Sequence, residues 1–333
     1  MPFKSVATVS VQALLKVMAD GQYHSGEALG ELLGVSRTAV WKHLQKFEGL
    51  GLPLESIKGK GYRIPAGIEL IDESYILSAL NATANSFLTE LDVQHSVDST
   101  NTMAMQRLLA GSAHGYVCCA EHQAQGRGRR GRTWVSPFGQ SLYLSAVVEF
   151  SEGAAALEGL SLAVGVALVR AMRDVAVADV GLKWPNDVLR DDKKVAGILL
   201  EMTGDPAGHC QVVVGVGVNV ALTADLSDVV DQPWTDLVSA NPNLSRNEFA
   251  AVLLNHLLPL LQSFHQVGFS AYRDEWESMS LHSGRLVGLH TAGETVVEGE
   301  LLGVTQSGAL RLRVNGSEQQ FSGGEVSLRP VLV

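Results

Sequence analysis

The amino-acid sequence predicts an α+β protein in three parts, and three observations carry this prediction. Residues 1–66 have eight basic and five acidic side chains, a net charge of +3, which leaves -13 for the remaining 267 residues. From residue 91 onward, short β-rich runs alternate with helical patterns, as in a mixed sheet layered with helices. Residues 284–330 contain short strand-like runs. The predicted domains are therefore 1–66, 67–283 and 284–333.

The composition indicates a folded protein that does not cross a membrane. The chain has 333 residues, a formal net charge of -10, 46% hydrophobic and 18% charged residues, which excludes a disordered or low-complexity chain. Its most apolar helical stretch, residues 157–172, contains Glu158 and Arg170 and is too short for a membrane span. Three cysteines without metal-ligand spacing, and first residues without an apolar signal core, predict a cytoplasmic protein without disulfides or zinc.

The basic N-terminal part predicts a winged helix-turn-helix. Apolar residues between positions 11 and 18 recur at helical spacing and predict a first helix. Ser25 and Ser36 are suitable N-caps for two further helices, which Gly34 separates. The runs 52–57 and 62–65 flank a tip of alternating lysine and glycine, so they predict a β-hairpin, the wing.

This arrangement favours DNA binding. The third helix would pack Val40, Leu44 and Phe47 inward and expose polar and basic residues, which are the types that hydrogen-bond to bases and phosphates. A small helical bundle with a solvated basic face is the alternative, but caps, turn glycine and basic wing occur together. The expected DNA contacts are Ser25, Ser36, Arg37, Thr38, Trp41, Lys42, Lys58 and Lys60.

The central part predicts a mixed sheet with helices on one face. Helical patterns cover residues 100–110 and 157–175. An antiparallel hairpin is predicted around the turn at Gly204-Asp205-Pro206. The predicted strands are 92–97, 116–120, 142–150, 193–202 and 209–219.

Residues 126–132 read Gly-Arg-Gly-Arg-Arg-Gly-Arg and are called the arginine loop below. They satisfy the G-x-G-x-x-G pattern of dinucleotide sites, but such a site needs a helix directly after the glycines and none is predicted there, which argues against a dinucleotide site. A disordered RNA-binding tail and a solvated loop are the alternatives. Because arginine forks and glycine backbones both bind phosphates and carboxylates, and the surroundings are acidic, an anion-binding lid is favoured.

Further polar motifs stand at strand ends. Lys183-Trp184-Pro185-Asn186-Asp187 places polar groups where they can meet a ligand or Mg²⁺, although a simple turn would also account for its last two residues. The runs 194–197 and 215–219 place a lysine and glycines in apolar strands, where glycines permit close approach. The run 99–101 is most simply a helix cap, and the helix N-terminus can receive an anion.

Several common catalytic motifs are missing from the sequence. It contains no nucleophile elbow, H-E-x-x-H helix or G-x-x-x-x-G-K-[ST] loop. What remains is cationic charge suited to a phosphate. This favours positioning and electrostatic catalysis of a transfer at phosphorus.

In order and spacing, these motifs resemble those of the biotin protein ligases, specifically the bifunctional type that is also the biotin operon repressor. The resemblance rests on the arginine loop with Trp134 and on the runs 183–187, 194–197 and 217–219, and it extends to the winged helix and to a C-terminal β-domain ending at 323–327. It implies a class II synthetase-like ligase domain and a C-terminal SH3-like β-barrel.

The resemblance implies a two-step reaction. Biotin and Mg-ATP give biotinyl-5′-adenylate and pyrophosphate, and a lysine of the biotin carboxyl carrier protein of acetyl-CoA carboxylase then attacks the adenylate. The implied catalytic residues are Lys194, Arg129 and Arg127. The implied biotin contacts are Ser99, Thr100, Asn101, Gln123, Arg127, Gly128, Arg129, Lys194 and Gly197. The implied nucleotide contacts are Arg129, Arg132, Trp134, Lys183, Asn186 and Asn219, with Asp187 as a Mg²⁺ contact.

The resemblance also implies regulation. The adenylate-bound chain would form a homodimer and bind biotin operator DNA. Residues 222–243 match the family poorly, so no adenine contact is assigned there. Two other functions are open: a DNA-binding regulator that senses biotin without ligase activity, and a ligase of lipoate or another carboxylate.

Overall fold

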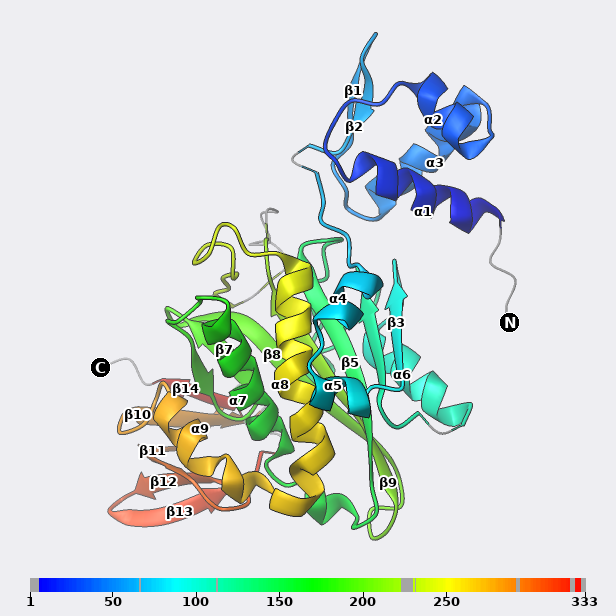
Figure 1. Cartoon of the computed structure of the whole chain (residues 1–333). Coiled ribbons are helices and arrows are strands. Elements are labelled where there is room, and N and C mark those ends of the chain that lie inside the picture. The colour runs from blue at the N-terminus through cyan, green and yellow to red at the C-terminus, as the bar shows by residue number, and fades with distance from the viewer. Residues whose placement is uncertain are drawn as a thin grey trace.

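The computed structural model describes residues 6–65, 67–111, 113–222, 230, 232–291, 294–323 and 327–330. Within them the chain forms a winged helix-turn-helix, a central α/β part and a C-terminal β-domain (Figure 1). The predicted α+β fold class is confirmed. Parts of the sequence predictions lie outside the described residues. These are residues 1–5 and 66 of the first domain, residues 112, 223–229 and 231 of the second, and residues 292–293, 324–326 and 331–333 of the third.

The N-terminal part forms because its caps and its apolar pattern agree. Its elements are α1 Val6–Met18, α2 Gly26–Leu33, α3 Arg37–Gly49, β1 Glu55–Ile57 and β2 Gly61–Arg63. Ser25 Oγ accepts a hydrogen bond from Ala28 N at 3.0 Å, and Ser36 Oγ accepts one from Ala39 N at 3.3 Å. Gly34 ends α2 with a φ of 63°. The inward packing predicted for α3 is confirmed, because its three apolar residues are buried.

Seven strands within the described residues form the central sheet, in the order β3-β4-β5-β9-β8-β7-β6. Their bounds are β3 Glu90–Gln94, β4 Tyr116–Ala120, β5 Ser141–Phe150, β6 Gly181–Lys183, β7 Asp187–Arg190, β8 Lys193–Gly204 and β9 Cys210–Asn219. Among these described pairings, β3 and β4 run parallel and the others antiparallel, so the predicted mixed sheet is confirmed. The predicted hairpin is β8 with β9.

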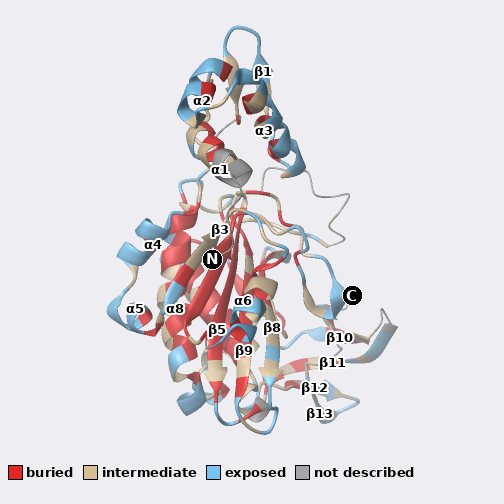
Figure 2. Cartoon of the chain, turned by 90° about the vertical axis from the view of Figure 1, so that its right-hand side faces the viewer, coloured by how far each residue is buried: buried red, intermediate tan, exposed pale blue. Residues whose placement is uncertain are grey.

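Helices cover both faces of this sheet, so the expectation of one covered face was wrong. The bounds are α4 Glu73–Ala79, α5 Ala82–Phe87, α6 Thr100–Leu109, α7 Leu160–Asp174, α8 Arg246–Val267 and α9 Arg273–Met279. Helices α7 and α8 pack on one face, and α6 packs its Ala104 and Leu108 against Cys118, Val147 and Val213 on the other. The parallel pair β3 and β4 requires a crossover, and α6 supplies it. Figure 2 shows β5 and β9 buried at the centre of the sheet.

The C-terminal part is an antiparallel sheet. Its strands are β10 Leu286–Thr291, β11 Glu294–Val304, β12 Leu310–Val314, β13 Ser317–Phe321 and β14 Ser327–Pro330, ordered β13-β12-β11-β10-β14 in the described residues. The SH3-like closure expected for it stays a prediction. The sheet contacts the central part, because Trp184 Nε1 donates a hydrogen bond to Gly308 O at 3.1 Å and Arg273 Nε donates one to Val304 O at 2.9 Å.

A buried polar network joins the linker after the winged helix to the central part. Arg246, at the start of α8, forms an ion pair with Glu121 at 2.6 Å, and the two side chains are 3% and 1% exposed. The second oxygen of Glu121 accepts a hydrogen bond from Ile71 N, and Glu69 accepts one from Arg246 N. Phe138, which follows the arginine loop, packs into the apolar cluster of the winged helix. The winged-helix part is therefore anchored to the central part close to the arginine loop.

The sequence predicts that the chain has no disulfide bond and no membrane-spanning helix. Cys118, Cys119 and Cys210 are all buried and unbridged. Burial raises the pKa of the Cys118 thiol to about 12, so this thiol stays protonated and unreactive. Among the helices that the structure describes, none combines the length and apolar character that a membrane span requires.

Candidate active site

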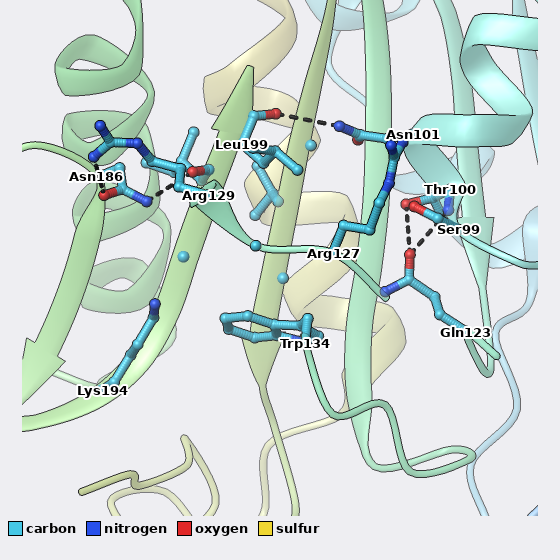
Figure 3. A pocket seen from close by; sticks show the side chains of 16 residues that line it. Ser99, Thr100, Asn101, Gln123, Arg127, Arg129, Trp134, Asn186, Lys194 and Leu199 are labelled. Atoms are coloured by element: carbon cyan, nitrogen blue, oxygen red, sulfur yellow. Dashed lines mark hydrogen bonds between the residues drawn. The ribbon is translucent and has the colours of Figure 1, made fainter. Parts of the chain in front are cut away.

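Two adjoining pockets lie beside the arginine loop, on the face of the sheet that carries α6 (Figure 3). The narrow pocket has a volume of about 50 Å³ and the wider cleft about 740 Å³. Their linings share Gly128, Arg129, Trp134, Asn186 and Lys194. These shared residues come from motifs that are up to 66 residues apart in the sequence.

Neutral polar groups from α6, β5 and the loop after β4 form the base of the narrow pocket. Gln123 Oε1 accepts hydrogen bonds from Thr100 N at 2.9 Å and from Thr100 Oγ1 at 3.2 Å. Ser145 Oγ lies 2.7 Å from Thr100 Oγ1 and 2.6 Å from Asn101 Oδ1. Ser99 stands at the N-cap but its side chain makes no capping bond, so Gln123 replaces it as the acceptor for the first turn. The run 99–101 therefore begins a helix, as predicted, with Ser99 at the N-cap position but without a capping bond from its side chain.

Glycines in β8 and β9 leave room for two side chains that line the pocket. A Cβ at Gly217 would lie 2.7 Å from Cε2 of the Trp134 ring, and one at Gly197 would lie 2.9 Å from Cζ3 of the same ring. At Gly215 the Cβ would lie 2.1 Å from Asn101 Oδ1. The close approach predicted for these strand glycines is confirmed. The indole of Trp134 thus lies flat on the glycine surface between the two pockets.

Lys194 stands where the two pockets meet. Its Nζ lies 2.7 Å from Asp187 Oδ1 and 5.2 Å from the centre of the Trp134 ring, and both members of the ion pair are mostly buried. Its backbone is fixed by Lys194 N donating to Pro233 O at 2.9 Å and by Thr235 N donating to Lys194 O at 3.0 Å. The single ammonium group of Lys194 therefore lines both pockets.

The wider cleft is strongly cationic. One acidic side chain, Asp187, lines it within the described residues. Burial lowers the pKa of Lys183, with Asp187 opposing the shift, and burial also lowers the pKa of Arg129. The cationic lining residues are Arg129, Arg130, Arg132, Lys183, Lys194 and Arg329. Guanidinium and ammonium groups in this density suit a polyphosphate.

The arginine loop is tied to three different parts of the chain. Arg127 Nη2 donates a hydrogen bond to Glu201 Oε2 at 3.0 Å, on β8. Arg129 donates to Asn186 Oδ1 at 3.0 Å and to the carbonyl of Gly323 in the C-terminal domain. Gly128 N donates to Arg132 O within the loop at 2.8 Å. Residues of the loop thus line both pockets, and its role as a lid stays a prediction.

Every site residue that the sequence suggested for the two small molecules lines one of the pockets. Ser99, Thr100, Asn101, Gln123, Arg127 and Gly197 line the narrow pocket, and Arg132, Lys183, Asp187 and Asn219 line the cleft. Asn219 Nδ2 also donates to Thr235 O at 3.0 Å. Their roles toward a ligand stay predictions.

Sequence reasoning missed several residues. Ser145, Ser136 and Glu201 take part in the hydrogen bonds around the narrow pocket, and Trp234 and Arg329 line the cleft. Glu201 could have been noticed in the sequence, because it is a carboxylate in an otherwise apolar strand. It lies four residues after Gly197, so both residues face the same side of the sheet. Nothing in the sequence around Arg329 points to the cleft, since only the packing of the C-terminal domain brings this residue there.

The residues proposed for DNA contact lie on the winged helix. Arg37, Thr38, Trp41 and Lys42 on α3 are exposed, and so are Lys58 and Lys60 at the wing tip. Trp41 keeps 49% of its surface accessible, which is unusual for a large aromatic side chain. The hydroxyls of Ser25 and Ser36 serve as helix caps.

Comparisons with known proteins agree across the chain. Residues 93–219 match the model of the Biotin/lipoate A/B protein ligase family, residues 11–63 an HTH domain and residues 282–329 the Biotin protein ligase C terminal domain. The chain is 39% identical to the bifunctional ligase/repressor BirA of Escherichia coli (strain K12) over 95% of this chain and 96% of that protein. The chain belongs to the bifunctional biotin protein ligase/repressor family.

Other members of the biotin protein ligase family support this assignment. The bifunctional ligase/repressor BirA of Bacillus subtilis (strain 168) is 28% identical over 93% of this chain and 95% of that protein. The biotin protein ligase of Aquifex aeolicus, solved in complex with biotin and ATP, is similar in structure with a TM-score of 0.63 and 28% identity. That likeness covers 73% of this chain and 100% of the Aquifex chain. The family predicted from the motifs is confirmed.

Proposed function

We propose that this chain joins biotin to ATP as biotinyl-5′-adenylate and transfers the biotinyl group to a lysine of the biotin carboxyl carrier protein of acetyl-CoA carboxylase. The observation that carries the proposal is the junction of the two pockets at Lys194. A narrow pocket with neutral polar groups suits biotin, and a cationic cleft suits the triphosphate. Family membership supports the same reaction.

The chemistry needs positioning and charge. In the first step a carboxylate oxygen of biotin attacks the α-phosphorus of ATP, and pyrophosphate leaves with the electron pair of the broken P–O bond. Lys194 Nζ, close to both pockets, stabilises the negative charge that develops between carboxylate and phosphate. In the second step the carrier lysine amine attacks the carbonyl carbon of the anhydride, and AMP leaves.

The remaining proposed contacts follow from which pocket each residue lines. For biotin and its carboxyl group we propose Ser99, Thr100, Asn101, Gln123, Arg127, Gly128, Arg129, Lys194 and Gly197. For the nucleotide we propose Arg129, Arg132, Trp134, Lys183, Asn186 and Asn219. Trp134 would pack over the adenylate, and the arginine loop would exclude water from the anhydride.

Mg²⁺ belongs to the nucleotide substrate in this proposal. Within the described residues no group of three His, Cys, Asp or Glu side chains could hold a metal ion. A single carboxylate together with substrate phosphates is nevertheless a common way for proteins to bind Mg²⁺. Asp187, the acidic residue of the described cleft lining, fits that arrangement as a neighbour of Lys194.

The ligase proposal is tested by mixing the chain with biotin and Mg-ATP and measuring pyrophosphate release and label transfer to a carrier domain. We expect both products, and we expect lipoate to compete poorly with biotin. Pyrophosphate without transfer would limit the proposal to its first step. Biotin binding without either product would contradict the proposal and favour a regulator that only senses biotin.

Replacing Gly217 by alanine tests the contact with Trp134. The new methyl group would stand 2.7 Å from the ring, so the indole must move away from its place between the pockets. We expect biotinyl-adenylate to escape about tenfold faster, because overpacking of this kind costs about 1–3 kcal/mol. Gly49→Ala, where the added Cβ meets open space, is the control. Equal escape rates from the two variants would contradict this placing of Trp134.

We also propose that the adenylate-bound homodimer binds biotin operator DNA through α3 and the wing, in the cytoplasm. The exposed residues Arg37, Thr38, Trp41 and Lys42 and the basic wing tip support it. The adenylate must favour the dimer for ligand and DNA binding to be coupled. Ordering of the arginine loop, including Arg130, is the proposed source of that preference.

Lys42→Ala tests the DNA-binding surface. If Lys42 contacts a phosphate, we expect the slope of log affinity against log salt to become shallower by about 0.9 for each lost contact. Lys16→Ala is a matched control, because Lys16 is an exposed lysine of the same domain whose charge acts on Asp72 in the linker region. A slope that changes equally in both variants would contradict the assignment of α3 as the DNA-contacting helix.

A further inference from the structure

Glu201 occupies a place between the narrow pocket and the arginine loop. Its Oε2 accepts a hydrogen bond from Asn101 Nδ2 at 2.7 Å and another from Arg127 Nη2 at 3.0 Å. The Glu201 side chain is 27% exposed and that of Arg127 47%. One carboxylate oxygen therefore joins the first arginine of the loop to the helix that forms the base of the pocket.

A chain of hydrogen bonds continues from Glu201 across the base of the pocket. Asn101 Oδ1 lies 2.6 Å from Ser145 Oγ, which in turn lies 2.7 Å from Thr100 Oγ1. Thr100 donates to Gln123 Oε1, and Gln123 Nε2 donates to Ser136 Oγ at 3.2 Å. The chain thus begins at Arg127, at the start of the loop, and ends just beyond Trp134, on the segment that leaves it.

The arrangement fixes the Asn101 side chain by hydrogen bonds at both ends of its amide group. Its Nδ2 is directed to Glu201 Oε2, with Leu199 O at 3.4 Å, and its Oδ1 is directed to Ser145. Figure 3 shows the side chain of Arg127 running alongside Asn101 toward this end of the pocket. Glu201 thus accepts a hydrogen bond from each of the two side chains, and Arg127 Nη2 also donates one to Thr102 Oγ1 at 3.2 Å.

We propose that Glu201 is a positioning residue of the ligase: its carboxylate holds Arg127, and through Arg127 the arginine loop, over the biotin pocket. The proposal rests on the proposed ligase function and adds to it. Within the described residues Glu201 itself lines neither the narrow pocket nor the cleft, but it contacts two residues that line the narrow pocket, so it acts through these two partners. Without the negative charge, the like-charged arginines of the loop lose the anchor at its first arginine.

Limited trypsin digestion of the ligand-free full chain tests the anchor without any assumption about activity. Trypsin cuts after arginine, so cleavage within the arginine loop reports the opening of the loop, and fragments cut after Arg129, Arg130 and Arg132 are counted by mass spectrometry. We expect Glu201→Gln to be cut there about three- to tenfold faster than the protein without substitutions. The reason is that losing a partly exposed ion pair raises the fraction of molecules in which the loop is open by about this factor. Glu201→Asp, which keeps the charge, should fall between them.

Glu275→Gln is the matched control, because Glu275 pairs with Arg170 at a similar exposure of 33%, away from the pockets. It should leave cleavage of the arginine loop unchanged. Thermal unfolding of each variant checks that the fold is retained. Equal loop cleavage in Glu201→Gln and the unchanged chain would overturn the proposal.

A double-mutant cycle separates positioning from a merely structural role. If Glu201 acts through Arg127, Glu201→Gln should raise the biotin KM and the rate of adenylate escape about three- to tenfold, leave kcat for pyrophosphate release within about twofold, and add nothing in an Arg127→Ala background. Additive effects would overturn the proposal. If the protein without substitutions releases no pyrophosphate, the proposed ligase function is contradicted. The trypsin digestion would still show whether Glu201 holds the arginine loop.

Discussion

Replacing Lys194 by alanine is expected to lower the rate of biotinyl-adenylate formation by about 100- to 1,000-fold. The reason is the loss of the charge that stands where the two pockets meet, since one preorganised group facing a developing negative charge contributes this much in other enzymes. Binding of biotin alone should weaken much less. Single-turnover formation of adenylate, measured after rapid mixing with biotin and Mg-ATP, gives the rate.

Lys193 provides the matched control for this prediction. It is the neighbouring lysine on β8, but it is exposed and lines neither pocket within the described residues. Lys193→Ala should keep the rate within about twofold. Because Lys194→Ala also removes the partner of Asp187, Lys194→Ala/Asp187→Asn should be about as slow as the single variant. A rate restored by the second change would mean that an unpaired Asp187, rather than the missing ammonium, caused the loss.

Arg246→Ala is expected to lower the free energy of unfolding by about 3–5 kcal/mol. The variant leaves the carboxylate of Glu121 buried at 1% exposure without its cation, which is the costly way to break a buried ion pair. It also removes hydrogen bonds to Ser141 O and to the carbonyl of Glu69 in the linker. Denaturant unfolding followed by circular dichroism measures the change.

The exposed ion pair of Arg313 with Glu300 serves for comparison. Its side chains are 51% and 42% exposed, so Arg313→Ala should cost less than about 1 kcal/mol. In the buried pair, Arg246→Leu/Glu121→Gln should recover part of the loss because no buried charge is left unpaired. Equal free energies of unfolding for Arg246→Ala and Arg313→Ala would contradict the stabilising role that the burial of the linker network indicates.

Local signals in the sequence were sufficient for the winged helix and for most strands. Ser25, Ser36 and Gly34 act at helix ends within a few residues, so caps and turn could be placed without knowing the tertiary fold. The antiparallel pairing of β8 and β9 follows in the same way from one turn between two apolar runs. The arginine loop and Lys194 were identified as site residues because their residue types suit anions.

Features that depend on packing between distant segments were not predictable. The position of α6 on its own face of the sheet follows from the parallel pairing of β3 with β4, which the strand patterns do not specify. Gln123 replaces Ser99 as the cap because the loop after β4 folds back onto α6. Arg329 reaches the cleft from the C-terminal domain, and Glu201 gains its importance from partners 74 and 100 residues away.

Under the proposed function, a molecule made in the two pockets controls DNA binding by the same chain. The most direct test titrates the protein against a palindromic duplex, selected from random-sequence DNA in the presence of biotin and ATP. Affinity is measured with neither small molecule, with each alone and with both. We expect markedly tighter binding and a dimeric complex when both biotin and ATP are present, and weak binding in the other three conditions. Equal affinity in all four conditions would contradict it.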